Sequence, residues 1–198
     1  MSGPDPSSGE GNHYQRMLAG EPYIADDPQI AADHRRAMLL LDGYNGDLAA
    51  SASDRRRILV ELLGSIGPDT EIRPPLFCDY GHRLHVGART FVNFGLMALD
   101  VAPIVIGDDV QIGPYVQLLT PTHPIDARAR RDKWESARPI TIADNVWLGG
   151  GVVVLPGVSI GPDTVIGAGS VVTRDIPGGV VALGNPARIS RDAVEGPQ

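Results

Sequence analysis

His123 is the first candidate for chemistry, because it stands between two prolines where the chain's most regular pattern breaks off. An imidazole titrates near neutral pH and can take a proton from an alcohol. The segment Thr120-Pro-Thr-His-Pro124 restricts the backbone on both sides of this side chain. A lone histidine is more often packed or solvated than catalytic, but its place beside the one large interruption of the repeat favours a general base.

Three further polar side chains could serve such a base. Asn93 follows Val92 at a turn position where glycine is common. Asparagine tolerates a left-handed turn, and its amide can equally donate to a developing oxyanion, so both interpretations stay open. Asp79 and Asp100 are carboxylates near the same end of the predicted solenoid and could bind sugar hydroxyls, although isolated aspartates more often face solvent.

A zinc site is a weaker alternative. His82, His85 and His123 raise the possibility of three-histidine coordination. Residues three apart on a strand face opposite sides, so the first two fit one metal poorly unless a turn separates them.

The segment Trp147-Leu-Gly-Gly-Gly151 combines a large ring with an unobstructed backbone, which suits a long, thin ligand. Thr173, Arg174 and Arg188 lie further along and could meet phosphates. The chain has no G-x-G-x-x-G fingerprint, Walker loop or G-x-S-x-G elbow, so kinase, dehydrogenase and serine-hydrolase functions lack support.

The element that must position these residues is a repeat of six. Every sixth residue from 142 to 172 is a branched aliphatic: Ile142, Leu148, Val154, Ile160, Ile166 and Val172. A helix repeats its apolar face every three to four residues and a strand every two, whereas a period of six is typical of a parallel β-helix. The sequence therefore predicts a β-solenoid whose recurring aliphatic points into a narrow core.

The same period can be followed upstream, and it fails once. Val86, Val92 and Ala98 are in phase, two extra residues bulge out near 100–103, and Ile106, Ile112 and Leu118 restore the count. The next three places hold Pro124, Arg130 and Ser136, which no such core would accept. We therefore expect residues 124–138 to form a loop ejected from the solenoid, and long loops in compact domains are usually functional.

The chain before the repeat has a different character. Residues 1–12 are rich in Gly, Pro and Ser and are expected to be disordered. Residues 13–70 predict a small helical region, with Asp27 and Ser53 as helix N-caps. The solenoid is expected over 71–190 and a frayed tail over 191–198. An arginine cluster in the helical region indicates either solvated helix faces or a contact with substrate or a second subunit: Arg35, Arg36, Arg55, Arg56 and Arg57.

Composition excludes several classes of function. The net charge of -7 argues against a surface for nucleic acid or anionic membrane. A single cysteine cannot form an intrachain disulfide, and no apolar run approaches the length of a membrane span. These features predict a soluble, cytoplasmic protein. A solenoid with flat sides favours a cyclic oligomer, with outward residues such as Val153, Val165 and Val171 meeting a neighbour.

Nine short motifs in this order resemble the hexapeptide-repeat sugar O-acetyltransferases of the maltose, galactoside and nodulation type, over about residues 14–191. They are Met17-Leu-Ala-Gly-Glu21, Tyr44-Asn45, Cys78-Asp-Tyr-Gly81, Val92-Asn-Phe94, Leu99-Asp100, Thr122-His-Pro-Ile-Asp126, Ile142-Ala-Asp-Asn-Val-Trp-Leu-Gly149, Pro156-Gly-Val-Ser-Ile-Gly161 and Gly184-Asn-Pro-Ala-Arg188. The set is specific, whereas any one hexad is weak. The maltose branch is the most similar.

The resemblance implies a left-handed β-helix, a homotrimer with sites between subunits, acetyl-CoA as donor and a sugar such as maltose, glucose or a galactoside as acceptor, with no metal. It implies His123 as general base, Asn93 as transition-state stabiliser, and Asp79 at an acceptor-binding position. On the CoA side it implies Trp147, Gly149, Gly150, Ala168, Thr173, Arg174, Arg188 and Arg191.

Two departures from the galactoside pattern bear on specificity. Gly150 stands where a serine is usual, so only its backbone can bind, and Ala25 stands where an acceptor-binding aspartate is usual, which leaves Asp26 as a doubtful substitute. The alternatives are a zinc lyase of the carbonic-anhydrase-like solenoid type, a non-catalytic solenoid for assembly, and an antibiotic or serine acetyltransferase.

Overall fold

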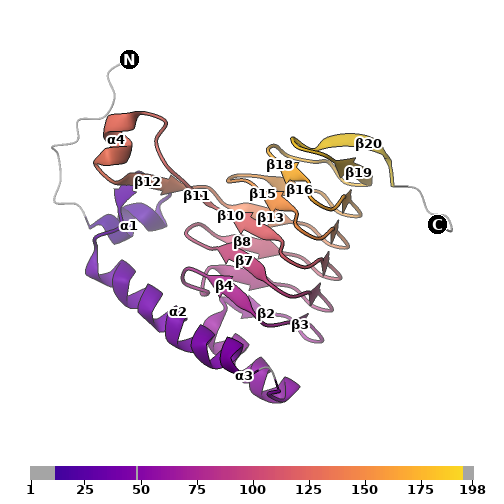
Figure 1. Ribbon diagram of the computed structural model, residues 1–198, viewed down its shortest axis with the longest axis horizontal. Helices are drawn as coiled ribbons and strands as arrows, with labels where there is room; N and C mark the ends of the chain where they lie inside the picture. The colour runs from indigo at the N-terminus through magenta and orange to yellow at the C-terminus, as the bar shows by residue number, and fades with distance from the viewer. Residues whose placement is uncertain (1–11, 48, 194–198) are drawn as a thin grey trace.

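The computed structural model describes residues 12–47 and 49–193 of the 198-residue chain, and Figure 1 shows a helical region leading into a solenoid. The predicted disorder of residues 1–12 falls almost wholly on residues 1–11, which lie outside the described residues. Residues 194–198 of the predicted tail lie outside them too.

The N-terminal region holds three helices: α1 (His13–Leu18), α2 (Pro28–Gly46) and α3 (Ala52–Leu62). The predicted N-cap Asp27 is confirmed, since its side chain accepts the backbone N–H of Gln29. The third helix begins earlier than expected, because Ser51 and not Ser53 accepts the N–H of Asp54.

The solenoid is a three-sided prism of parallel sheets, each turn of the chain adding one strand to each side (Figure 1). The first sheet contains β2 (Ser65–Ile66), β5 (Leu84–Val86), β8 (Ile104–Ile106), β13 (Ile140–Ile142) and β16 (Ser159–Ile160). The second contains β3 (Glu71–Ile72), β6 (Phe91–Val92), β9 (Gln111–Ile112), β14 (Trp147–Leu148), β17 (Val165–Ile166), β19 (Val180–Leu183) and β20 (Arg188–Asp192). The third contains β4 (Leu76–Cys78), β7 (Leu96–Leu99), β10 (Gln117–Leu119), β15 (Val153–Val154) and β18 (Val171–Val172).

The six-residue period works as predicted, because each recurring aliphatic stacks on its counterpart one turn away. Ile106 pairs with Ile142, which pairs with Ile160, and all three are at most 2% exposed. Burying each such side chain contributes about 1.5–3 kcal/mol. The core is therefore a column of aliphatics along the prism axis.

Both ends of the solenoid differ from the expected 71–190. The first strand, β2, begins at Ser65 and pairs in parallel with β5, so the solenoid starts inside the stretch assigned to helices. Arg56 closes this end by donating to the carbonyl oxygens of Ile66 and Thr70. At the other end, β20 extends to Asp192 because it pairs antiparallel with β19.

The interruption leaves at the edge between the third and first sheets and carries its own elements: β11 (Pro121–Thr122), α4 (Ala127–Arg131) and β12 (Trp134–Ala137). Ile106 and its partner Ile142 are 36 positions apart, whereas Ile142 and Ile160 are 18 apart, so the insertion has the length of one full turn and keeps the phase. β12 lies between β11 and β1 (Tyr23–Ile24) in a three-stranded antiparallel sheet. Trp134 packs against the ring of His13 and under the guanidinium of Arg16, which fixes the loop to α1.

Candidate active site

The three-stranded sheet brings Tyr23, Glu135 and His123 into one row. Tyr23 on β1 pairs directly with Glu135 on the central strand β12. On the other side Thr122, the last residue of β11, pairs with Ser136, so His123, which follows the strand, comes next to Glu135. Directly opposed residues of antiparallel strands point to the same face, with Cβ atoms about 4.5–5.5 Å apart.

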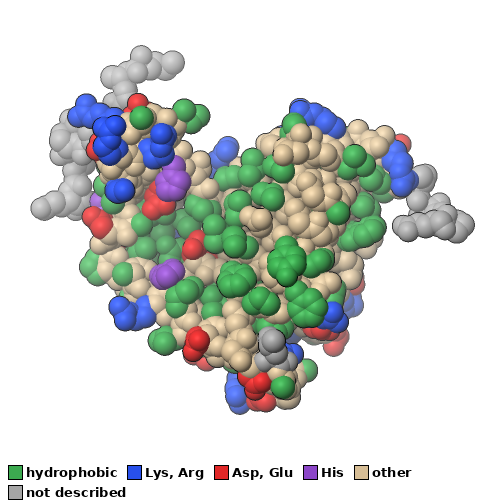
Figure 2. Space-filling view, in the orientation of Figure 1, with side chains coloured by type: hydrophobic (Ala, Val, Ile, Leu, Met, Phe, Trp, Pro, Cys, Tyr) green, Lys and Arg blue, Asp and Glu red, His purple; other side chains and the backbone are tan. Residues whose placement is uncertain are grey.

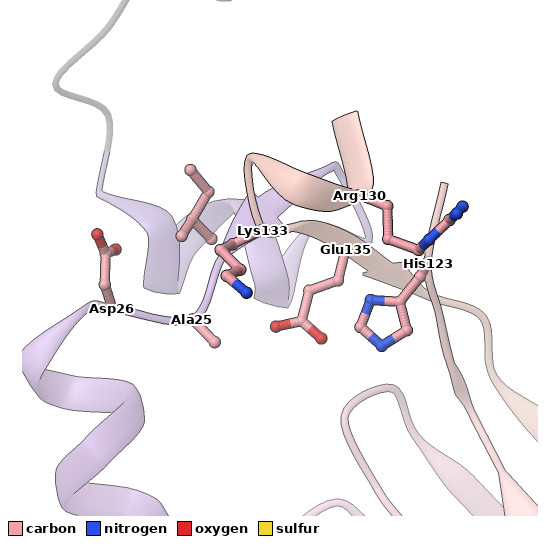
Figure 3. A pocket seen from close by; sticks show the side chains of 7 residues that line it. Ala25, Asp26, His123, Arg130, Lys133 and Glu135 are labelled. Carbon is pink, nitrogen blue, oxygen red and sulfur yellow. The ribbon is translucent and has the colours of Figure 1, made fainter. Parts of the chain in front are cut away.

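His123 opens onto a pocket of about 520 Å³ between the ejected loop and the β1 segment. In Figure 3 the carboxylate of Glu135 points toward the imidazole, whereas the side chain of Asp26 lies at the far end and Ala25 presents only its methyl group. Arg130 and Lys133 contribute the cationic side of the lining, and Arg130 also donates to two carbonyl oxygens of its own loop.

Burial perturbs the carboxylates around this pocket. It raises the pKa of Asp79 to about 6, with the negative charges of Asp100 and Glu135 adding to the effect. Burial also raises the pKa of Glu135, while the charge of His123 and the nearby hydroxyl of Tyr23 oppose that shift. Burial raises the pKa of the Tyr23 phenol above its usual range, so this hydroxyl stays a neutral donor.

Asp100 is not an acceptor-binding residue of the kind the sequence predicted. Its side chain is fully buried, and Oδ1 accepts the backbone N–H groups of Asp79 and Tyr80 while Oδ2 accepts that of Arg83. A carboxylate with both oxygens bonded to backbone and no exposed surface cannot reach a ligand. Asp100 instead supports the turn that carries the half-buried Asp79.

Asn93 and His123 are not brought together within one chain. Asn93 follows β6 at the edge between the second and third sheets, which we call the Asn93 edge; His123 lies at the edge between the third and first sheets, the His123 edge. The third sheet separates them, and its four-residue strand β7 alone extends on the order of 13 Å. The amide of Asn93 keeps its nitrogen available, because Oδ1 accepts the N–H of Phe94.

The glycine-rich segment also lies on the Asn93 edge. Gly149 donates its N–H to Ile166, and a side chain there would meet the backbone of Ala168 at 2.5 Å, so its role is close packing between turns. In the described part of the chain the N–H groups of Gly150 and Ala168 have no hydrogen-bond partner. Trp147 is 48% exposed on the adjoining second sheet. A ligand could therefore use two free N–H groups beside a ring.

The remaining predicted residues divide between the two sides. Thr173 and Arg174 are exposed on the His123 edge just after β18. Arg188 and Arg191 are exposed on β20 at the C-terminal end of the second sheet. No single surface of one chain carries the whole predicted set.

Nothing in the described ranges resembles a zinc centre. Residues 12–47 and 49–193 contain no group of three His, Cys, Asp or Glu side chains arranged to hold a metal ion. His85 shares a hydrogen bond with Ser65 on the first sheet, and the ring of His82 packs beside Tyr80.

Glu135 and Tyr23 escaped sequence reasoning. Both depend on strand pairings between segments more than 100 residues apart, which no local pattern reports. The sequence offers one local signal for Glu135, which is a carboxylate next to Trp134 within the ejected loop, where a function is expected.

A solenoid with a six-residue period, an ejected histidine-bearing loop and free edge amides defines the class of hexapeptide-repeat acyltransferases. The maltose acetyltransferase hexapeptide capping motif matches residues 16–67, and the bacterial transferase hexapeptide motif of six repeats matches residues 139–174. Nodulation protein L of Rhizobium meliloti is 48% identical over 88% of this chain and 96% of its own length.

Comparison with solved structures leads to the same class of protein. A maltose O-acetyltransferase from Clostridium difficile has a TM-score of 0.91 at 41% identity, covering 94% of this chain and 100% of that one. A hexapeptide-repeat acetyltransferase from Vibrio cholerae, complexed with acetyl-CoA, has a TM-score of 0.86 at 37% identity, covering 93% and 100%. The chain belongs to the hexapeptide-repeat sugar O-acetyltransferase family, and the predicted left-handed β-helix and acetyltransferase class are confirmed. No helix within the described residues is both long and apolar enough to cross a membrane.

Proposed function

We propose that the protein transfers the acetyl group of acetyl-CoA to a hydroxyl group of a sugar, with His123 as general base. The observation that carries the proposal is an exposed histidine on a pocket of about 520 Å³ whose lining combines carboxylates with cationic groups. Carboxylates are suitable partners for sugar hydroxyls. Relatives named as a maltose O-acetyltransferase and as an acetyltransferase complexed with acetyl-CoA support both substrates.

The proposed reaction is direct transfer. His123 takes the proton of the acceptor hydroxyl as its oxygen attacks the thioester carbonyl carbon, and the resulting tetrahedral oxyanion accepts hydrogen bonds. The carbon–sulfur bond then breaks, and the leaving CoA thiolate takes up the proton that His123 holds. The free Nδ2 of Asn93 and the unpaired N–H of Gly150 are suited to the oxyanion, whereas the N–H of Gly149 is already used.

Because the two proposed catalytic groups lie on opposite edges, a complete site needs two chains. The His123 edge of one chain would meet the Asn93 edge of the next, and a head-to-tail contact of this kind can close into a ring, which we propose is a homotrimer. The third sheet would then face the ring's axis. Its outward residues include Phe77, Met97, Val153 and Val171, and hydrophobic side chains cover much of the visible solenoid face in Figure 2.

We further propose that CoA lies along this junction. Trp147, Gly150 and Ala168 would contact the pantetheine arm from one chain. The exposed cations Arg174, Arg188 and Arg191 would meet its phosphates, together with the hydroxyl of Thr173. Asp79 would bind acceptor hydroxyls beside His123, with Asp100 supporting its backbone.

The test is His123→Ala, assayed by thiol release from acetyl-CoA against a panel of sugars including maltose, glucose and a galactoside. General-base catalysis is typically worth about 10²–10⁴-fold, so turnover should fall by that factor while acetyl-CoA binding by calorimetry is unchanged. His34→Ala, on the exposed side of α2, is the matched control. Turnover near that of the unchanged protein in His123→Ala would remove the proposal, and failure to bind acetyl-CoA would favour a non-catalytic solenoid.

A further inference from the structure

We propose that Glu135 is a positioning residue for His123, held in place by Tyr23, so that the three form a phenol–carboxylate–imidazole row across the ejected sheet. The inference rests on the proposed function, because it assigns Glu135 a role only if His123 is the base. It also gives the ejected loop a role, because β12 of this loop brings Glu135 back toward His123, which lies where the loop begins.

The row follows from strand register. β12 is the central strand, and both of its neighbours run antiparallel to it. On β1 the partner of Glu135 is Tyr23, and on the other side the pairing of Thr122 with Ser136 brings His123, the residue after β11, next to Glu135. Figure 3 shows the carboxylate of Glu135 turned toward the imidazole ring. Tyr23 and Glu135 are held by the pairing of their strands, and His123 directly follows a paired strand, so all three positions are set by the sheet.

Tyr23 provides the anchor. It is 1% exposed and packs in a small buried cluster with Tyr80 and Val101, so its hydroxyl is fixed in direction. Tyr23 is paired with Glu135 across the two strands, and its hydroxyl opposes the rise in the pKa of Glu135 that burial causes. Tyr23 thus limits where the Glu135 side chain can lie on this face of the sheet.

The charges around the row are mixed. Asp79, on the turn after β4, adds a second negative charge that interacts with Glu135. Lys133 and Arg130 on the ejected loop and Asp26 after β1 line the same pocket. The half-buried Glu135 is the carboxylate that lines this pocket next to the histidine on the strand paired with β11.

The chemical role follows from the charge that His123 acquires. When the imidazole takes the acceptor proton it becomes an imidazolium, and an adjacent fixed carboxylate stabilises this cation and keeps the ring aimed at the acceptor. Such help is greatest in the transition state, so its loss lowers kcat more than it raises KM. A residue that only bound the acceptor would show the opposite pattern.

The experiment compares Glu135→Gln, Tyr23→Phe and His123→Ala, with Glu61→Gln on the exposed side of α3 as the matched control. We expect kcat of Glu135→Gln to fall at least about 10-fold with both KM values within about twofold. The acidic limb of the pH profile of kcat/KM, where activity falls as the pH decreases, should move to lower pH in Glu135→Gln, because the imidazolium has lost its anionic neighbour. Tyr23→Phe keeps the carboxylate and should lower kcat by a smaller amount than Glu135→Gln does, because the negative charge remains beside the imidazole.

The outcomes separate the inference from the function on which it rests. An increase confined to the acceptor KM of Glu135→Gln, with an unmoved acidic limb, would assign Glu135 to acceptor binding and overturn the inference. If kcat and the acidic limb of Glu135→Gln are unchanged while His123→Ala is inactive, the inference is also overturned, but the assignment of His123 as general base stands. If His123→Ala itself stays active, the proposed function fails first. Melting temperatures distinguish all of these from misfolding, since the control and Glu135→Gln should melt within a few degrees of each other.

Discussion

Asp100 holds the backbone of Asp79 in place through a carboxylate that never reaches solvent. Its Oδ1 lies 3.0 Å from the backbone nitrogen of Asp79 and 2.8 Å from that of Tyr80, and its Oδ2 lies 3.2 Å from that of Arg83. One buried side chain thus satisfies three backbone donors in the turn between β4 and β5. The position of Asp79, whose carboxyl interacts electrostatically with that of the pocket residue Glu135, depends on this support.

Replacing Asp100 by Ala should therefore destabilise the protein strongly. One buried and two part-buried N–H groups would lose their acceptor. Each orphaned donor costs about 1–3 kcal/mol, so we expect a loss of about 3 kcal/mol in the free energy of unfolding. Urea unfolding followed by circular dichroism measures it. Asp132→Ala, at an exposed position on the ejected loop, should change the midpoint little. A small loss in Asp100→Ala would mean that water or a shifted turn replaces the carboxylate.

The stability of the protein should fall as pH rises through about 6, because of Asp79. Burial and the charges of Asp100 and Glu135 raise its pKa from 3.8 to about 6 in the folded state. The protonated form is therefore favoured by folding: its contribution is fully present below pH 3.8 and is lost as the carboxyl ionises near pH 6.

Asp79→Asn removes the ionisable carboxyl, and with it the loss of stability that ionisation causes. At pH 8 we expect the variant to be more stable than the unchanged protein by on the order of 1–2 kcal/mol, with the difference vanishing near pH 4. Urea titrations at both pH values measure the difference, and Asp26→Asn at an exposed position is the control. A difference independent of pH would assign the gain to something other than ionisation. The acceptor KM of Asp79→Asn should rise, if Asp79 binds sugar hydroxyls.

Cys78 should play no part in the reaction. Its side chain is 4% exposed in the solenoid core, and burial raises the pKa of its thiol, so little thiolate forms. We expect no reaction with a thiol-specific reagent until the protein is unfolded. Cys78→Ser should keep its turnover and lose about 1–2 kcal/mol of stability, because a hydroxyl replaces sulfur in an apolar site. Rapid labelling of the native protein would show that this part of the core opens easily.

The solenoid could be predicted from sequence because its determinants are local and repeated. Ile142, Leu148 and Val154 each report the same inward position on three successive sheets, so the period alone specifies the whole prism. The ejected loop was equally visible, since Pro124 and Arg130 cannot occupy core positions.

What could not be predicted depends on contacts between distant segments. Glu135 gains its place only when β12 pairs with β1 on one side and β11 on the other. Asp100 looked like a surface carboxylate because nothing local shows that three backbone N–H groups converge on it. The separation of Asn93 from His123 is likewise a property of the closed prism, since a sequence pattern does not say which edge a turn occupies.

That separation leads to a complementation prediction. If each site takes its base from one chain and its oxyanion donor from the next, then His123→Ala and Asn93→Ala are each inactive alone. The first variant still has Asn93, and the second still has His123. In mixed trimers, a junction is complete when an Asn93→Ala chain supplies His123 and a His123→Ala chain supplies Asn93.

Random assembly of the two variants in equal amounts makes about one junction in four complete, so co-expressed protein should recover roughly a quarter of normal turnover per chain. Differential tags allow mixed trimers to be purified and assayed against each homotrimer, and about one junction in three should then be complete in the mixed single variants. The double variant co-expressed with unchanged chains serves as the control, since its junctions are complete only between two unchanged neighbours, which also gives about a quarter before the homotrimers are removed. No recovery in the mixed single variants, with recovery in that control, would mean that both groups act within one chain, which requires the ejected loop to swing across the whole third sheet from its docked position against Arg16 and His13.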